Sequence, residues 1–477
     1  MIDAQAAVVD HVTRHVQRQE NGAQDPQDWW RAVRTGIKDL LRRGKVRKEE
    51  IRSIGVTGDD YGLVCVSREG LALNNVHLSP HDDLIPYADA FTEAFGARNM
   101  INLVGGPAFN ACSASLADWI KDHQPRHWHD CAAIMNPRGF LNYRLSGQNI
   151  CDPSTAAAMR MYNPRSNGWS KMVLDRLNIP AAWLPEVHPG PRLGGRVTPV
   201  AARETGLSPG TPIAVGANRT ASIAIAAGGV EPGMGILELG GNGHLSVITD
   251  SWQKPKPETM EISCHTVNKC WALIMRGIGN DRHIRWHNDE MAATDVQQWR
   301  RAGRSAMEAI AELAAEAPPG SDNLHFISHR DGGGLVGLRP GHQRRHVLRA
   351  MLESVGYTVR RAITELKDIG VTLPGLHLIG EGAESHLWCQ IIADVCGLET
   401  HSIDRPHAAL VGAGILAGAA IGVHKTPAAM AKKLPAKSRS FQPRRAAAEV
   451  YDAQSSTHQR LQELLPTILH QEAEEAP

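Results

Sequence analysis

Residues 212–247, which read PIAVGANRTASIAIAAGGVEPGMGILELGGNGHLSV, are the stretch that most narrows the folds open to this chain. A short β-rich run precedes a turn and a helix of small residues, and two further β-rich runs follow, joined by a glycine-rich loop. The alternation recurs at 323–370 and at 377–403, where strand patterns precede helical ones. Strands that alternate with helices predict α/β domains with mixed sheets.

The chain has 477 residues, which is too long for one hydrophobic core because single cores stop growing near about 250–300 residues. The sequence therefore predicts two large domains, at 1–225 and 226–430. Residues 431–477 are expected to form a basic linker and a C-terminal amphipathic helix, at 446–471, that docks back on a domain. Residues 25–44 carry an Asp cap, an early Pro and a Gly stop, and so predict a helix.

Charge and hydropathy exclude several classes of partner. Lys and Arg number 51 against 50 Asp and Glu, so no net field favours nucleic acid. The most apolar tract, residues 408–423, is too short to span a bilayer, and the first residues show no signal peptide, so we expect a cytoplasmic protein without a membrane partner. The eight cysteines form no Cys-x-x-Cys pair, which predicts reduced, buried thiols and no metal site.

Six segments, in order, resemble one known family, the FGGY carbohydrate kinases such as xylulokinase and glycerol kinase. They are QDPQDWW, IGVTGDDYGLV, LNYRLSGQNICDPSTAA, GLSPGTPIAVGANRTASIAIAAGGVEPG, LELGGNGHLSV and IGEGAESHLWCQIIADVCG. Agreement of six segments in order and spacing is far more specific than a single glycine loop.

The resemblance implies an α/β, two-domain, actin-like ATPase (ribonuclease H-like) fold. In such kinases the N-terminal domain holds the sugar, the C-terminal domain holds most of ATP, and Mg²⁺ bridges the phosphates. The family's first phosphate hairpin, Asp-x-Gly-Thr, precedes the segment that MIDAQAAVVDHVTRHV resembles. We therefore expect a first strand hairpin that is missing or truncated, and a different start of the chain is the open alternative.

The catalytic position of the family departs most from its pattern. Aligned without gaps, the family's Gly-Gly-Asp-(Asn/Gln)-Ala-Ala falls on GANRTAS, which puts Arg219 where the catalytic aspartate stands. A shift by one residue puts Asn218 there instead. An arginine keeps its proton near neutral pH because its pKa exceeds about 12, so it does not act as a general base.

The sugar-contacting turn is changed as well. The family often has Gly-Gln-Met-His-Gly, and here the turn reads GDDYG, with Asp59, Asp60 and Tyr61 between two glycines. We expect these three residues to contact hydroxyls or a cationic group of a ligand, and a water-exposed Asx turn is the alternative. The Trp-x-Asp-x-Arg element of the family is absent from residues 74–85.

Both glycine loops that resemble nucleotide-binding parts are altered. The second phosphate loop, residues 239–243, reads LGGNG and offers Gly240, Gly241, Asn242 and Gly243 in place of the family's hydroxyl residues. The adenosine loop reads GEGA, which comprises Gly380, Glu381, Gly382 and Ala383. Backbone donors remain in both loops, but Glu381 adds a negative charge that is expected to repel ATP phosphates.

Changes at several parts of one site predict a homologue with a degenerate active site. Such a protein binds a sugar-like, phosphorylated or carboxylated ligand, as a pseudokinase or with repurposed chemistry, and a homo-oligomer or partner subunit stays open. Arg219 then binds an anion with Asn218 beside it, or pairs internally with Asp59, Asp60 or Glu238. ATP and Mg²⁺ follow from the resemblance alone, and no other cofactor is expected. The alternative is an active ATP-dependent sugar or polyol kinase whose base is Asp59 or Asp60.

Overall fold

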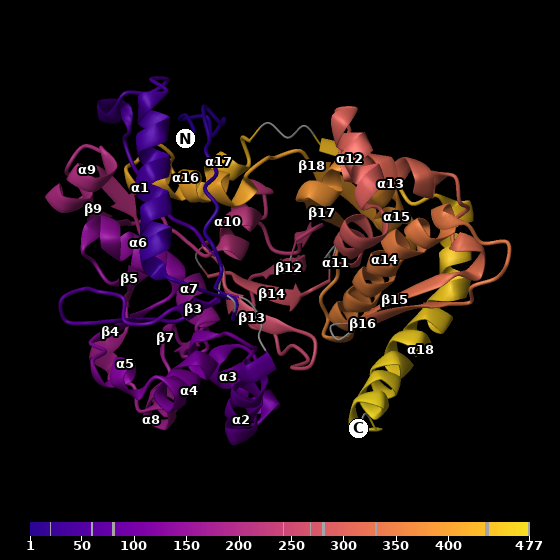
Figure 1. Ribbon diagram of the computed structural model, residues 1–477, viewed down its shortest axis with the longest axis horizontal. Helices are drawn as coiled ribbons and strands as arrows, with labels where there is room; N and C mark the ends of the chain where they lie inside the picture. Colours follow the sequence, from indigo (N-terminus) through magenta and orange to yellow (C-terminus); the bar gives the residue numbers. More distant parts are fainter. Residues whose placement is uncertain are drawn as a thin grey trace. The chain divides into compact units, whose positions relative to one another are not determined.

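The computed structural model of the protein describes residues 1–19, 21–58, 61–78, 82–241, 243–267, 269–278, 282–329, 332–434 and 438–475. The chain divides into two compact units, and Figure 1 follows their elements along the sequence. The first unit comprises residues 1–232, 248–273 and 407–435, and the second comprises residues 233–247, 274–406 and 436–477. Each unit is described by itself.

The first long helix shows how closely local sequence sets an element. α1 (Pro26–Arg42) begins at Asp25, whose side chain accepts a hydrogen bond from the Gln27 N–H at 2.8 Å. A proline at the first helical position needs no N–H donor, so it suits this place. The predicted helix at 25–44 is confirmed, and its apolar face buries Trp29 and Trp30.

The first unit consists of short strand pairs surrounded by helices. Its strand pairs are β1 (Ala23–Gln24) with β3 (Val76–His77), β2 (Val64–Val66) with β4 (Ala133–Met135), β5 (Ile150–Cys151) with β8 (Glu186–Val187), β6 (Tyr162–Asn163) with β7 (Gly168–Trp169), and β9 (Leu193–Arg196) with β10 (Pro212–Ala214). The strand β13 (Glu261–Cys264) also belongs to this unit and lies beside the helix α7 (Pro153–Ala158). Its remaining helices are α2 (Ile85–Phe95), α3 (Ala97–Val104), α4 (Ser113–His123), α5 (Pro125–His129), α6 (Pro137–Ser146), α7 (Pro153–Ala158), α8 (Lys171–Leu177), α9 (Pro199–Thr205), α10 (Arg219–Ala226), α16 (Ala408–Ala420) and α17 (Pro427–Ala431).

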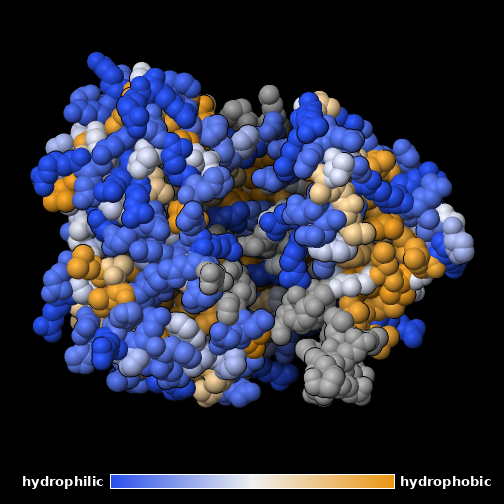
Figure 2. All heavy atoms as spheres, viewed as in Figure 1, coloured by the Kyte–Doolittle hydropathy of each residue, from blue (hydrophilic) through white to orange (hydrophobic). Residues whose placement is uncertain are grey.

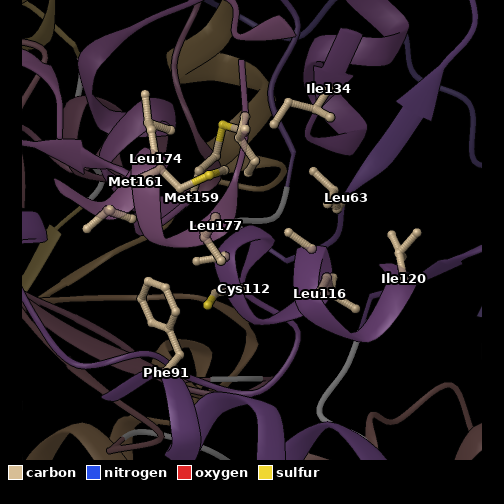
Figure 3. Close-up of a cluster of buried hydrophobic side chains, with 14 of the residues drawn as sticks. Leu63, Phe91, Cys112, Leu116, Ile120, Ile134, Met159, Met161, Leu174 and Leu177 are labelled. Carbon is tan, nitrogen blue, oxygen red and sulfur yellow. The ribbon is translucent and has the colours of Figure 1, made fainter. Parts of the chain in front are cut away.

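A large apolar cluster stabilises the part of the first unit between β2 and α8. Figure 3 shows Leu63, Phe91 and Leu116 turned toward a common centre, with Met161 and Leu177. All five side chains are buried. Burial of apolar side chains is the main favourable term in folding, so this cluster stabilises the part of the unit that Tyr61 packs against.

A second cluster joins α10 to α16, although these helices are far apart in sequence. Ala221, Ile225 and Ile415 are buried against one another in this cluster. The helices approach so closely that a Cβ added at Gly412 would lie 1.9 Å from the Ser222 carbonyl oxygen. The apolar tract at 408–423 therefore contains α16, one face of which is buried within the first unit.

The second unit is built on a mixed sheet. In strand order its sheet contains β14 (Trp271–Arg276), β12 (His244–Thr249), β11 (Gly235–Glu238), β17 (Gly375–Ile379), β18 (Glu399–Ile403) and β19 (Ser438–Phe441). β11 pairs in parallel with β17 and antiparallel with β12, while β17 pairs in parallel with β18. The predicted strands and the predicted mixed α/β organisation are confirmed here.

Helices and one hairpin complete the second unit. They are α11 (Arg282–Trp286), α12 (Ala293–Arg301), α13 (Ala306–Ala315), α14 (Arg344–Asp368), α15 (His386–Cys396) and α18 (Arg445–Glu475), with the hairpin of β15 (His325–His329) and β16 (Gly332–Val336). α18 packs against α14, α15 and β15 through Ala447, Tyr451 and His458. These buried side chains stabilise the contact of α18 with the rest of the second unit.

Two further expectations concern thiols and membranes. All eight cysteines are free, and six of them are buried, as predicted. Within the described part of the chain, no helix is both long and apolar enough to cross a bilayer.

Candidate functional site

In the first unit, the segment before the GDDYG turn runs alongside β10. The Ile54 N–H donates to the Pro212 carbonyl oxygen, and the Ala214 N–H donates to the Ile54 carbonyl oxygen, each at 2.9 Å. Further along, the Thr57 hydroxyl donates to the Ser222 hydroxyl of α10 at 3.1 Å. The two segments therefore end next to each other, at the start of α10.

The structure places two predicted site residues, Asn218 and Arg219, next to Gly58 at this point. Asn218 caps α10, because its side-chain oxygen accepts from the Ala221 N–H at 2.9 Å. The backbone N–H of Arg219, the first residue of α10, donates to the Gly58 carbonyl oxygen at 2.9 Å. Gly58 directly precedes Asp59 and Asp60, which lie outside the described residues.

The start of a second helix, α7, lies next to the start of α10. Asp152 caps α7 by accepting from the N–H groups of Ser154 and Thr155, and both hydroxyls donate to it as well. The Asn218 N–H then donates to the Ser154 hydroxyl at 3.3 Å, and its side-chain amide donates to the Ser154 carbonyl at 3.2 Å. Asp152 and Ser154 thus fix the position of Asn218, although sequence reasoning did not single them out.

Arg138 connects these elements from the inside. Its guanidinium donates to the Val215 carbonyl at 2.6 Å and to the Val56 carbonyl at 3.3 Å, and lies 3.3 Å from the Asp152 carboxylate. A Cβ at Gly216 would lie 2.9 Å from this guanidinium, and Gly216 has a φ of +77°, so the close approach requires glycine. The Arg138 guanidinium is positioned to hold both segments in register.

Tyr61, predicted to contact a ligand, is half-buried beside the apolar cluster of Figure 3. Its ring packs edge to face on Phe109, with ring centroids 5.4 Å apart. This packing supplies a structural role for the ring, and a ligand contact of Tyr61 stays a prediction.

In the second unit, the two predicted nucleotide loops lie side by side. The parallel strands β11 and β17 are neighbours, and the loops follow their carboxyl ends. Gly240, Gly241 and Gly243 all have positive φ values, of +101°, +58° and +21°. Asn242 lies outside the described residues. Ligands of α/β sheets bind at the carboxyl ends of strands, which suits a nucleotide here.

The GEGA loop contains a tight backbone crossing. Gly380 has a φ of +100°, and an added Cβ would lie 2.6 Å from the Leu239 carbonyl oxygen. The Gly382 N–H donates to the same oxygen at 3.1 Å, and a Cβ at Gly382 would lie 2.5 Å from the Trp388 ring. Because Gly380 and Gly382 lack side chains, the GEGA loop can lie close to the LGGNG loop. Ala383, the last residue of the GEGA loop, is buried. Such a cradle fits the close approach of a nucleotide.

Carboxylates gather near this loop. Burial raises the pKa of Glu384, and the negative charges of Glu381, Asp404 and Glu308 raise it further. Glu381 itself is exposed. Glu381 and these acidic neighbours make the electrostatic potential at the GEGA loop negative.

Three other observations concern an ion pair, a loop contact and metal binding. Glu238, which we considered as a partner of Arg219, lies 3.0 Å from the His244 ring within the second unit. The Arg285 guanidinium donates to the Gly241 carbonyl oxygen at 3.3 Å, a contact that the loop pattern did not predict. Within the described residues, no group of three His, Cys, Asp or Glu side chains is arranged to hold a metal ion.

Comparison with known proteins identifies the family. Residues 2–226 match the N-terminal domain of the FGGY family of carbohydrate kinases, and residues 254–421 match its C-terminal domain. The chain belongs to the FGGY family of carbohydrate kinases. The two matched domains together cover most of the chain, so the resemblance seen in six short segments is confirmed at the level of the family.

Similar proteins of this family act on different substrates. The xylulose kinase of Staphylococcus epidermidis is 22% identical over 449 residues, which cover 92% of this chain and 88% of that protein. The autoinducer-2 kinase of an Enterobacter species is 25% identical over 440 residues, which cover 89% and 82%. The comparisons thus support a sugar kinase homologue, and they do not demonstrate the predicted loss of catalytic residues.

Solved structures confirm the fold. A ligand-bound xylulose kinase from Lactobacillus acidophilus has a TM-score of 0.87 with 17% identity, and covers 98% of this chain and 95% of its own. The xylulose kinase from Rhodospirillum rubrum has a TM-score of 0.82 with 23% identity, and covers 96% and 94%. The chain therefore has the two-domain α/β fold of the FGGY kinases, of the actin-like ATPase type.

Proposed function

We propose that the protein is an ATP-dependent kinase that phosphorylates a hydroxyl of a sugar or polyol. This is the alternative rather than the first of the two functions expected from the sequence. It is supported by membership of a kinase family and by similarity to xylulose and autoinducer-2 kinases over about nine-tenths of the chain. ATP enters as its magnesium complex, which is a substrate, and the reaction releases ADP.

One hydrogen bond carries the proposal for the acceptor side. The Arg219 N–H donates to the Gly58 carbonyl oxygen, so the turn with Asp59 and Asp60 starts at the helix end where the family pattern has its base. A carboxylate from that turn replaces the missing aspartate as general base. It accepts the proton of the substrate hydroxyl as the new O–P bond forms and the bond between the β- and γ-phosphates breaks.

The other residues have separate tasks in this proposal. Asn218 and Arg219 bind the acceptor, and the fixed charge of the Arg219 guanidinium stabilises negative charge on the reacting groups. Backbone N–H groups of Gly240 and Gly241 bind the nucleotide, in a loop whose positive φ values favour glycine. Gly382, whose N–H donates to the Leu239 carbonyl oxygen, keeps the second loop close to the first.

The test is release of ADP from Mg-ATP across a panel of sugars, polyols and sugar acids. Once an acceptor is found, Asp59→Asn or Asp60→Asn should lower kcat at least about 100-fold, which is the scale of a lost general base. Asp89→Asn, an exposed carboxylate on α2, is the matched control and should retain full activity. Full activity in both Asp59→Asn and Asp60→Asn would disprove the assigned base.

A second function is favoured by Arg219 itself, which stands at the family's base position and keeps its proton. In that case the protein binds a phosphorylated or carboxylated sugar-like ligand without phosphoryl transfer. No ADP release with any acceptor, together with ligand stabilisation that Arg219→Ala abolishes, would favour this function. Arg219→Asp would then be the variant that restores a base and measurable turnover.

A further inference from the structure

A cavity of about 450 Å³ opens on the first unit, between the short 3₁₀ helix η1 (Lys48–Glu50) and the turn at residues 208–212. Two apolar side chains, Ile51 and Ile421, line it, and both are half-buried. Cavities of this size hold small organic molecules. The lining therefore offers space and an apolar surface for a short carbon skeleton.

Two cationic side chains, Lys48 and Arg52, line the same cavity. No ion pair found among the described residues involves Arg52, and its side chain is exposed. The Lys48 ammonium lies 3.9 Å from the Glu49 carboxylate, and both side chains are more than half exposed. An exposed pair at this distance contributes little, so both cations are available to an anion.

The cavity lies at the end of a strongly basic segment. Between Arg31 and Arg52 the chain carries nine cationic residues against three acidic ones, whereas the whole chain is nearly neutral. Carboxylates pair with most of the cations before the cavity: Arg31 with Asp28, Arg42 with Asp39, and Arg43 and Lys45 with Asp10. Figure 2 shows a mostly hydrophilic surface over α1. With Lys48 and Arg52 against Glu49, the lining of the cavity carries one positive charge in excess.

We propose that this cavity binds a small phosphorylated polyol. Lys48 and Arg52 bind the phosphate, because a guanidinium donates two parallel hydrogen bonds to phosphate oxygens and an ammonium adds a point charge. The carbon skeleton packs on Ile51 and Ile421. The Glu49 carboxylate and the Ser208 hydroxyl, which also line the cavity, accept hydrogen bonds from the ligand's hydroxyl groups.

The cavity is separate from the candidate substrate site in the same unit. Arg52 lines the cavity and Gly58 contacts the start of α10, and an extended chain spans about 20 Å over the six residue steps from Arg52 to Gly58. Both positions lie on the segment that runs alongside β10. A phosphorylated ligand therefore binds here without competing with the acceptor, and this proposal does not depend on the proposed kinase activity.

Isothermal titration calorimetry with ribitol 5-phosphate and glycerol 3-phosphate tests the site on the full chain. Ribitol, glycerol and inorganic phosphate are the reference titrants. We expect the phosphorylated polyols to bind at least tenfold more tightly than any reference. Lys48→Gln and Arg52→Gln should each weaken that binding at least tenfold, while Lys38→Gln, an exposed cation on α1, should change it less than twofold.

Three results would overturn the proposal. Unchanged affinity in both Lys48→Gln and Arg52→Gln would place the ligand elsewhere. Equal losses in Lys38→Gln would show a diffuse charge effect. Inorganic phosphate that binds as tightly as the phosphorylated polyols would show an anion site without a place for the carbon skeleton. Thermal unfolding without ligand checks the variants, which should all retain the wild-type midpoint because these side chains are exposed.

Discussion

The guanidinium of Arg138 and the carboxylate of Asp152 lie 3.3 Å apart in the interior of the first unit, with side chains that are 0% and 1% exposed. Asp152 also caps α7 and accepts from two hydroxyls. Through Ser154 it fixes Asn218 at the start of α10. The buried ion pair of Arg138 and Asp152 is thus connected, through Ser154, to Asn218, which is proposed to bind the acceptor.

Removal of one charge of this pair should be strongly destabilising. Asp152→Asn leaves the Arg138 guanidinium buried without a counter-charge, for which we expect a loss of about 3–5 kcal/mol in the free energy of unfolding. Urea unfolding measures this loss. The matched control is Asp175→Asn, whose exposed pair with Lys171 should contribute less than about 1 kcal/mol.

A double substitution separates the pair from its neighbours. Arg138→Met combined with Asp152→Asn should cost less than the sum of the single changes, because neither charge is then left alone. Additive losses would mean that the two side chains act independently and would contradict the coupling.

Gly412 sets the distance between α10 and α16. Gly412→Ala would place a Cβ 1.9 Å from the Ser222 carbonyl oxygen, so the helices must separate. Overpacking of this kind costs about 1–3 kcal/mol, and it shifts the helix that begins at Arg219. We therefore expect lower stability and weaker acceptor binding, measured by urea unfolding and calorimetry. Leu410→Ala, on the exposed side of α16, should change both by little.

Local sequence was sufficient to predict the elements that carry the site. The 212–247 pattern folds as β10, α10, β11 and β12, in the predicted order, since periodicity and turn residues are local properties. The Asn218 cap and the two glycine loops are visible in the sequence for the same reason. The family resemblance then supplied the fold.

Long-range contacts could not be predicted in this way. Arg138 lies within a helix pattern, and only the folded chain shows that its guanidinium reaches Val215 and Asp152. The return of residues 407–435 to the first unit has no local signal either. The sequence Asp-Pro-Ser-Thr at 152–155 has the residue types of a helix cap, but only the structure shows that Ser154 contacts Asn218.

Gly380 tests whether the GEGA loop binds nucleotide. Gly380→Ala strains a residue with a φ of +100° and pushes a Cβ to 2.6 Å from the Leu239 carbonyl oxygen. We expect at least tenfold weaker binding of ADP by calorimetry. Gly397→Ala has a comparable backbone strain, with a φ of +62°, but open space around the new methyl group. The control should lose only stability, by about 1 kcal/mol, and retain ADP binding.

Glu381 is predicted to weaken nucleotide binding through its charge. Glu381→Gln removes a negative charge beside the loop and should raise the affinity for Mg-ATP several-fold at low ionic strength. The gain should shrink in 0.5 M salt, because screening weakens interactions of exposed charges. The same variant should lower the pKa of Glu384, since the Glu381 charge helps to raise it. Glu463→Gln, exposed on α18, is the control, and an equal gain there would contradict the local effect.

His458 is an unusual buried base on the inner face of α18. It is 1% exposed, and neither ring nitrogen has a hydrogen-bond partner within the described structure. Its ring stacks on Tyr357 of α14, with centroids 4.3 Å apart, and lies 5.6 Å from the His325 ring of β15. Burial, with a smaller contribution from the His325 charge, lowers the pKa of His458 to about 3.

This depressed pKa predicts that the docking of α18 weakens in acid. A base whose pKa is lower in the folded state takes up protons preferentially when it is unfolded, so its stabilising contribution is complete above about pH 6.5 and declines toward pH 3. Between pH 7.5 and pH 5.0 the loss is about 2 kcal/mol, or roughly 30-fold in the opening equilibrium. Hydrogen–deuterium exchange of residues 445–465, corrected for intrinsic rates, should show this increase. His458→Phe retains the stacking and should remove most of the pH dependence of exchange. His127→Gln, an exposed residue of the first unit, should leave that pH dependence unchanged. Equal pH dependence in His458→Phe and the wild type would assign the effect to other groups.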